Sequence, residues 1–214
     1  MLGLIRKNYF ETFRVKKNLF ENILGFGILG LMVAVGTDFY IFCLAVLIIL
    51  PLTGPSLFQY SMEQNEIYKF DDILLTYPLT KKEIIGSQFL ACLSFCGFTG
   101  ILSLFITFLY VFRHTTDLQT GLMIWATGII ISLAFLAVSS IGFFALGNKK
   151  GTIIYFIFVV LYAALYVLAY WNIDFMSIFT LDARLLLLIG LIVSLLLLMG
   201  SYYLCLKIYT KKHS

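Results

Sequence analysis

Charged residues are scarce in this sequence: Asp, Glu, Lys and Arg make up 12% of the 214 residues, whereas about a quarter of a soluble domain is charged. Histidine is nearly absent, since only His114 and His213 occur, and both fall at the ends of apolar segments. The sequence holds no Ser–His or Asp–Asp pair at membrane depth, no phosphate-binding loop and no potassium-channel filter. We therefore expect no catalytic residue, no metal and no cofactor in this chain.

Cysteine is also rare, and its placement carries no chemical signal. All four cysteines lie inside apolar segments, where such residues usually serve as small packing groups, and they form no zinc-binding pattern. They are Cys43, Cys92, Cys96 and Cys205.

Apolar residues, in contrast, make up 61% of the chain, and they gather in six segments of the length that crosses a bilayer, about 20 residues or more. We predict an all-α integral membrane protein with six transmembrane helices in a single membrane domain, residues 19–214. Pro51 and Pro55 predict a kink in the second span, a common feature of membrane helices. The predicted spans are residues 19–35, 39–61, 84–112, 118–147, 152–171 and 185–209.

The basic residues lie on alternate connections between these spans. Of the 15 lysines and arginines, only Arg113 and Arg184 fall on one side of the predicted membrane. Because basic residues concentrate on the cytoplasmic side, both chain ends are predicted to be cytoplasmic. The remaining 13 are Arg6, Lys7, Arg14, Lys16, Lys17, Lys69, Lys81, Lys82, Lys149, Lys150, Lys207, Lys211 and Lys212.

The N-terminal segment forms an amphipathic pattern, and its first 18 residues are predicted to be a helix. Apolar side chains fall near one helical face, and most basic residues lie elsewhere. Such a helix is expected to rest in the membrane interface with its bases toward anionic lipid. The apolar positions are Leu2, Ile5, Tyr9, Phe13 and Phe20.

The predicted cytoplasmic loop at about residues 62–83 carries a second helical pattern. Ile67, Phe70, Leu74 and Tyr77 recur at spacings that place them on one face of a helix, and Pro78 stops it. Thr80 and Glu83 then match the capping box S/T-x-x-E and start the third span. Two interpretations remain open: a loop lying in the lipid headgroups, or a helix that docks on a cytoplasmic partner.

Three predicted spans carry polar side chains at helical spacing. Small and hydroxyl residues commonly line helix interfaces in membranes, so helix packing is one interpretation of these faces. A mildly polar path for an amphipathic substrate is the other. The residues are Gln88, Cys92, Cys96, Thr99, Ser103 and Thr107 on the third span, Ser132 and Ser139 on the fourth, and Tyr155, Tyr162, Tyr166 and Tyr170 on the fifth.

No acid or base lies in the middle of any predicted span, although ion-coupled carriers usually keep one there. This argues that energy for any transport comes from a partner. An ion-coupled secondary transporter and a non-transporting membrane scaffold or immunity protein remain the alternatives.

The run YPLTKKEII, residues 77–85, is similar to the "LPxxRxEI" stretch of the permease subunits of ATP-binding-cassette exporters, type 2 permease family. The preceding FDDILL, residues 70–75, resembles the usual approach to it, and the overall layout resembles the short bacterial form, without a large external domain. The resemblance implies that the loop holds the helix that couples the permease to its ATPase. The coupling residues it implies are Ile67, Phe70, Asp71, Asp72, Leu74, Leu75, Pro78, Thr80, Lys81 and Lys82.

The same resemblance implies the partners and the location. Two permeases, as a homodimer or paired homologues, would assemble with an ATPase dimer, and ATP and Mg would bind in the ATPase. The complex would lie in a bacterial plasma membrane among lipids and export an amphipathic peptide or a similar hydrophobic substrate, with no role for nucleic acid.

Overall fold

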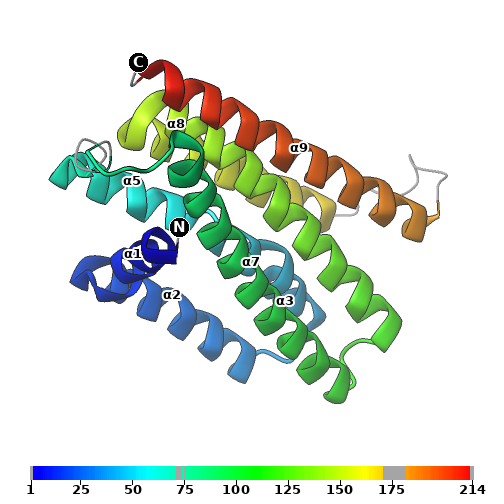
Figure 1. The fold of residues 1–214 in the computed structure, drawn as a ribbon. Helices are drawn as coiled ribbons and strands as arrows, with labels where there is room; N and C mark the ends of the chain where they lie inside the picture. The colour runs from blue at the N-terminus through cyan, green and yellow to red at the C-terminus, as the bar shows by residue number, and fades with distance from the viewer. Residues whose placement is uncertain (1, 71–73, 75, 171–181, 213–214) are drawn as a thin grey trace.

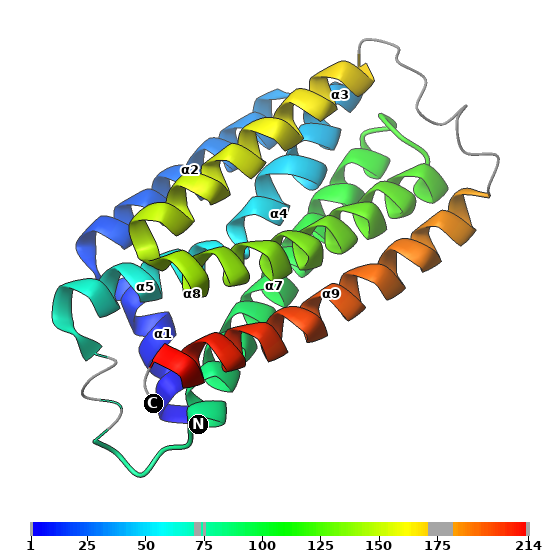
Figure 2. The ribbon, with the colours of Figure 1, turned by 90° about the horizontal axis from the view of Figure 1, so that it is seen from above.

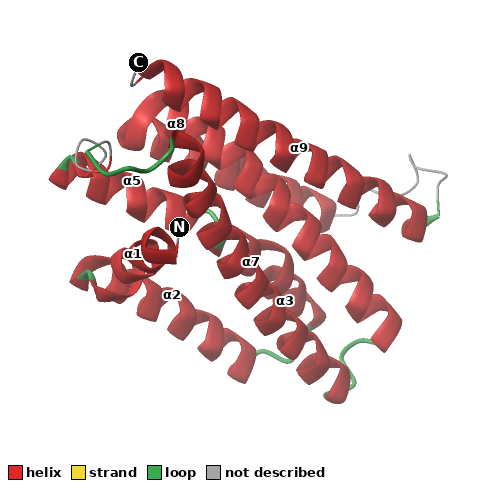
Figure 3. Cartoon of the chain, in the orientation of Figure 1, coloured by secondary structure: helices red, strands yellow, loops and turns green. Residues whose placement is uncertain are grey.

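The structure is a computed structural model that describes residues 2–70, 74, 76–170 and 182–212, and helices joined by short turns form nearly all of this part (Figures 1 and 3). No strand occurs in those ranges, so the predicted all-α class is confirmed. In chain order the elements are α1 (Leu2–Arg14), α2 (Lys16–Val35), α3 (Phe39–Cys43), the π-helix η1 (Leu44–Ile49), α4 (Leu50–Thr53), α5 (Ser56–Tyr68), α7 (Lys81–Phe112), α8 (Leu118–Tyr170) and α9 (Ala183–Lys212).

The long helices carry apolar side chains on their outer faces. In the described part of the chain, five helical stretches are long and apolar enough to cross a membrane, judged by length and composition. Large apolar groups such as Phe105 on α7 and Leu196 on α9 are well exposed, an arrangement that suits lipid and not water. The chain is an integral membrane protein. The stretches are Lys16–Val35, Phe39–Tyr68, Lys81–Phe112, Leu118–Leu168 and Ala183–Lys212.

Helix α8 contains the predicted fourth and fifth spans as two arms. The backbone leaves helical geometry at Gly147, where φ is +76°, a value that side-chain-bearing residues rarely adopt. Figure 2 shows that the second arm turns back beside the first. At about 1.5 Å per residue, the arms before and after Gly147 are roughly 45 and 34 Å long, enough for a hydrocarbon core of about 30 Å. The predicted loop at residues 148–151 is therefore wrong, because the reversal needs only Gly147.

The stretch that was predicted as the second span is helical but irregular. A π-helix, η1, precedes Pro51, and a turn at Gly54 and Pro55 separates α4 from α5. Proline lacks a backbone N–H and its ring crowds the preceding turn, so the predicted interruption follows from local chemistry. Figure 2 shows α3, α4 and α5 following a bent course between α2 and α7.

The N-terminal helix α1 ends at Arg14, so the predicted helix over residues 1–18 is too long, and only part of its apolar face is turned outward. Ile5 and Tyr9 pack against the core of the bundle, and Asn8 and Thr12 are buried. Leu2 stays exposed, as a membrane-interface helix requires. The helix therefore contacts α2, α5 and α7 as well as facing outward, an arrangement that the apolar periodicity alone did not predict.

The core of the protein divides into two clusters. One surrounds Phe58, Phe89 and Phe144, where α5, α7, α8 and α9 meet. The other surrounds Phe42 and Tyr110, where α2, α3, η1 and α7 meet. Both chain ends lie near the first cluster, at the end of the bundle where α7 begins (Figure 2).

Candidate functional site

The segment between α5 and α7 holds the predicted coupling residues. Helix α5 ends at Tyr68, and Lys69 adopts the left-handed conformation with φ +49°. Ile67 lies before this break, whereas Phe70 and Leu74 are helical and lie after it. The prediction of one continuous helical face from Ile67 to Tyr77 is therefore wrong, because the backbone changes direction at Lys69.

The break separates exposed side chains from buried ones. Ile67 and Tyr68 are 60% and 67% exposed, and Tyr77 is 58% exposed. Leu74 is only 4% exposed and belongs to the main core cluster. In this arrangement a partner can reach Ile67, Tyr68 and Tyr77, but not Leu74.

Lys7 of α1 holds Phe70 in place. Its ammonium nitrogen lies 3.9 Å from the centroid of the Phe70 ring, where the negative face of the ring attracts a cation. The same nitrogen donates to Asn65 Oδ1 at 3.3 Å and pairs with Glu11 at 3.2 Å. Sequence analysis missed the contacts of Lys7 with Asn65 and Phe70, because Lys7 and Asn65 are 58 positions apart. Of the three contacts, only the Lys7–Glu11 pair has a spacing, i,i+4, that a sequence can show.

Two further contacts fasten the N-terminal helices to the same region. Lys17 of α2 pairs with Glu63 of α5 at 2.6 Å, and the Tyr9 hydroxyl of α1 shares a hydrogen bond of 2.7 Å with Ser94 of α7. Lys7 contacts the segment before α7, and these two bonds tie α1 and α2 to the helices on either side of it, α7 and α5.

The predicted capping box is present at the start of α7. Glu83 N donates to Thr80 Oγ1 at 3.3 Å, and the Glu83 carboxylate accepts from Thr80 N at 2.9 Å. The bonds from the backbone and hydroxyl of Thr80 lower the pKa of Glu83, which precedes the predicted span. Pro78 and Lys82 are exposed, and Lys81 is half-buried. Asp71, Asp72 and Leu75 lie outside the described residues.

The polar face of α7 is buried inside the bundle. Gln88, Thr99, Ser103 and Thr107 are each at most 6% exposed. The three hydroxyl groups donate to carbonyl oxygens one turn back in their own helix, at 2.8–3.1 Å. The hydroxyl groups of Thr99, Ser103 and Thr107 therefore have hydrogen-bond acceptors within their own helix and need no ligand.

Small residues let the polar face of α7 and the first arm of α8 come close to η1. A Cβ added at Gly128 would lie 2.7 Å from the carbonyl oxygen of Val46. Thr99, Ser103 and Ser132 border a space of only about 10 Å³ at this contact. This geometry favours the helix-packing interpretation for those three residues, because small side chains permit close approach in membranes.

The tyrosines of the second arm of α8 bond to the broken second span. Tyr155, Tyr162 and Tyr166 donate to the carbonyl oxygens of Leu52, Leu47 and Tyr40, at 2.8, 2.8 and 3.2 Å. Leu47 lies four residues before Pro51, which has no amide hydrogen to donate, and in lipid such a carbonyl needs another partner. The side chain of Tyr170 lies outside the described part.

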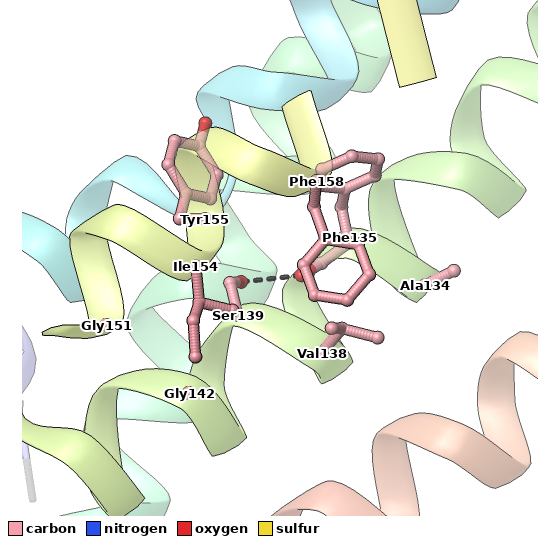
Figure 4. Close-up of a pocket in the computed structure, with 9 residues that line it drawn as sticks. All are labelled: Ala134, Phe135, Val138, Ser139, Gly142, Gly151, Ile154, Tyr155 and Phe158. Carbon is pink, nitrogen blue, oxygen red and sulfur yellow. Dashed lines mark hydrogen bonds between the residues drawn. The ribbon is translucent and has the colours of Figure 1, made fainter. Parts of the chain in front are cut away.

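A cavity of about 170 Å³ opens between the two arms of α8 (Figure 4). Ser139 and Tyr155 from the predicted polar faces both line it, so the fold brings these two together. Phe135, Ile154 and Phe158 make the rest of its wall largely apolar. Ser139 donates to the Phe135 carbonyl oxygen at 2.5 Å and Tyr155 donates to that of Leu52, so the two hydroxyl groups at this apolar cavity already have acceptors.

Within the described residues, no group of three His, Cys, Asp or Glu side chains is placed to hold a metal ion. All four cysteines are free and buried.

The all-helical bundle and its long apolar helices define an integral membrane protein of the all-α class. The sequence profile of the ABC-2 family transporter proteins matches residues 3–210, nearly the whole chain. The chain belongs to this family of membrane transport components, and membership implies an ATP-binding-cassette ATPase as partner. Neither a curated protein nor a solved structure gave a match.

Proposed function

We propose that this chain is the membrane-spanning subunit of an ATP-driven exporter in a bacterial plasma membrane. Its cargo is an amphipathic peptide or a similarly hydrophobic molecule. A separate ATPase dimer binds ATP and Mg and supplies the energy, and the permease itself catalyses no reaction.

The proposal includes six spans with both chain ends in the cytoplasm. Its support is the unequal distribution of basic residues together with the two arms of α8, each long enough to cross a bilayer. Lys149 and Lys150 come just after the Gly147 reversal, so this turn carries positive charge, which supports a cytoplasmic position for it.

The observation that carries the proposal is the exposed set Ile67, Tyr68 and Tyr77, hereafter the docking surface. Ile67 and Tyr68 are the last residues of α5, and Tyr77 lies four residues before the start of α7. Figure 2 shows the end of α5 and the start of α7 on the side of the bundle where both chain ends lie. Apolar and aromatic groups exposed to water, outside the lipid, mark a surface for another protein. Lys7 holds the neighbouring Phe70 against α1. A movement of this segment caused by an ATPase is therefore transmitted to the N-terminal helices.

The cargo route is proposed to lie between two permease copies. Ser139 and Tyr155 are the predicted path residues that border the cavity between the arms of α8. The wall is apolar, and both hydroxyl groups already donate to backbone carbonyl oxygens, so the cavity suits the apolar part of such a molecule.

The test replaces the docking surface by Ile67→Ser, Tyr68→Ser and Tyr77→Ser together. If these residues are interface hot spots, each loss costs about 2 kcal/mol or more, so association with the ATPase falls by over about 100-fold. The measurement is co-purification with the ATPase subunit, alongside export from cells. Phe112→Ser, at an even more exposed residue at the far end of α7, is the control and leaves association intact. Unchanged association in the triple variant overturns the proposal.

A further inference from the structure

A second cavity, of about 280 Å³, lies beside the docking surface but is lined by different residues. The end of α5, the Gly147 reversal of α8 and the end of α9 enclose it, and its apolar floor includes Phe143, Phe144 and Met62. Two lysines reach it from different helices, Lys69 and Lys212. We call it the Lys69 cavity.

We propose that the Lys69 cavity binds the phosphate headgroup of an anionic lipid of the cytoplasmic leaflet, with the acyl chains lying along the apolar floor. Basic pockets between membrane helices at the cytoplasmic side attract anionic headgroups. The inference rests on the predicted orientation, and it assigns a ligand that the export proposal does not need.

The charges of the lining favour an anion. Lys69 and Lys212 line the cavity together with one acid, Glu66. The Glu66 carboxylate already accepts a hydrogen bond of 3.1 Å from the backbone N–H of Asn148 at the Gly147 reversal. Lys149 and Lys150, both exposed, follow that residue directly and add to the positive charge at this end of the bundle.

A buried amide in the lining lacks an acceptor. Asn65 is 7% exposed, and its Nδ2 has no hydrogen-bond partner among the described residues. The orientation of the amide is fixed by Lys7, which can only donate and therefore requires Oδ1 to face it. A buried donor without an acceptor is costly, and a ligand oxygen at this end of the cavity would supply one.

The left-handed backbone conformation of Lys69 is a further argument that its side chain has a function in this cavity. Lys69 follows the last residue of α5 with φ +49°, in the left-handed region. Glycine is the usual residue there, because it adopts this conformation without steric cost. A lysine at this position carries strain, and the cationic side chain that it brings lines the cavity.

Because the backbone at Lys69 is strained, the charge can be removed there without destabilising the fold. Lys69→Gly removes the charge and relieves the backbone, so it should not lower the melting temperature of the ligand-free protein. Purified full-length protein is titrated with dioctanoyl phosphatidylglycerol while its melting temperature is followed. Dioctanoyl phosphatidylcholine and inorganic phosphate serve as separate comparisons, and Lys16→Gln, an exposed lysine at the start of α2, is the matched control.

We expect the anionic lipid to raise the melting temperature saturably and the other two probes to have little effect. Lys69→Gly should weaken lipid binding about fivefold, and Lys69→Gly with Lys212→Gln about 25-fold, since each base near an anionic headgroup contributes about 1 kcal/mol. Lys16→Gln should bind as the native protein does.

Three results overturn the proposal. Equal stabilisation by phosphatidylcholine would show that the cavity does not distinguish an anionic headgroup from a zwitterionic one. Full stabilisation by inorganic phosphate would assign the cavity to a free anion. No lipid effect, combined with protection of a Lys69→Cys label by the added ATPase subunit, would assign it to the protein partner.

Discussion

The hydroxyl group of Tyr162 donates a hydrogen bond of 2.8 Å to the carbonyl oxygen of Leu47, the residue four positions before Pro51. In an α-helix this carbonyl would accept from the amide of residue 51, and proline has none. A tyrosine from the second arm of α8 therefore takes the place of the missing donor across 115 residues of sequence.

This hydrogen bond predicts that the effects of mutating Tyr162 and Pro51 on stability are coupled. Tyr162→Phe should lower the free energy of unfolding by about 0.6 kcal/mol, the average for an interhelical hydrogen bond in a membrane. In a Pro51→Ala background the loss should shrink, because an alanine at position 51 can donate to Leu47. A double-mutant cycle measured by unfolding in detergent checks this. Equal losses in both backgrounds would contradict it.

Ser103 gives a test of the packing interpretation of the polar face of α7. The side chain is 4% exposed and borders a space of about 10 Å³, so Ser103→Phe has no room. We expect overpacking to cost about 1–3 kcal/mol and to lower the yield of folded protein. Ser103→Ala, which adds no bulk, should fold normally. A Ser103→Phe protein that is as stable as the native one but blocked in export would return this face to the path interpretation.

Lys7 is expected to matter for coupling and not only for membrane attachment. Lys7→Met keeps the alkyl chain but removes the ammonium group from the Phe70 ring and from Glu11, contacts worth about 1–2 kcal/mol when partly desolvated. Transport per ATP hydrolysed should fall in reconstituted vesicles while the protein still inserts. The exposed neighbour provides the control, Arg6→Met. Identical behaviour of the two variants would assign Lys7 to lipid contact alone.

The orientation is open to labelling with membrane-impermeant thiol reagents. All four native cysteines are buried, so engineered exposed sites should dominate the signal. Sites at His114 and Asp182 should react from outside the cell, and sites at Lys149 and Glu66 only after the membrane is opened. External labelling at Lys149 would reverse the orientation and place the docking surface outside.

Features set by neighbouring residues were predictable from sequence. The helix start at Thr80 and Glu83 and the interruption at Pro51 were predicted because each depends on residues within a turn of one another. The break at Lys69 was missed, since lysine gives no signal for a left-handed backbone. The Lys7–Phe70 contact and the bonds of Tyr155 and Tyr162 were missed too, because they join elements that only the folded chain brings together.

The central claim is that the exposed segment before α7 contacts an ATP-binding-cassette ATPase. A photo-crosslinking amino acid at Tyr77, with Phe112 as the control position, tests it in intact cells that express both subunits. Our account predicts a covalent adduct with the ATPase from position 77 and none from position 112. An ATPase adduct from position 112, or none from position 77 with the ATPase present, would contradict it.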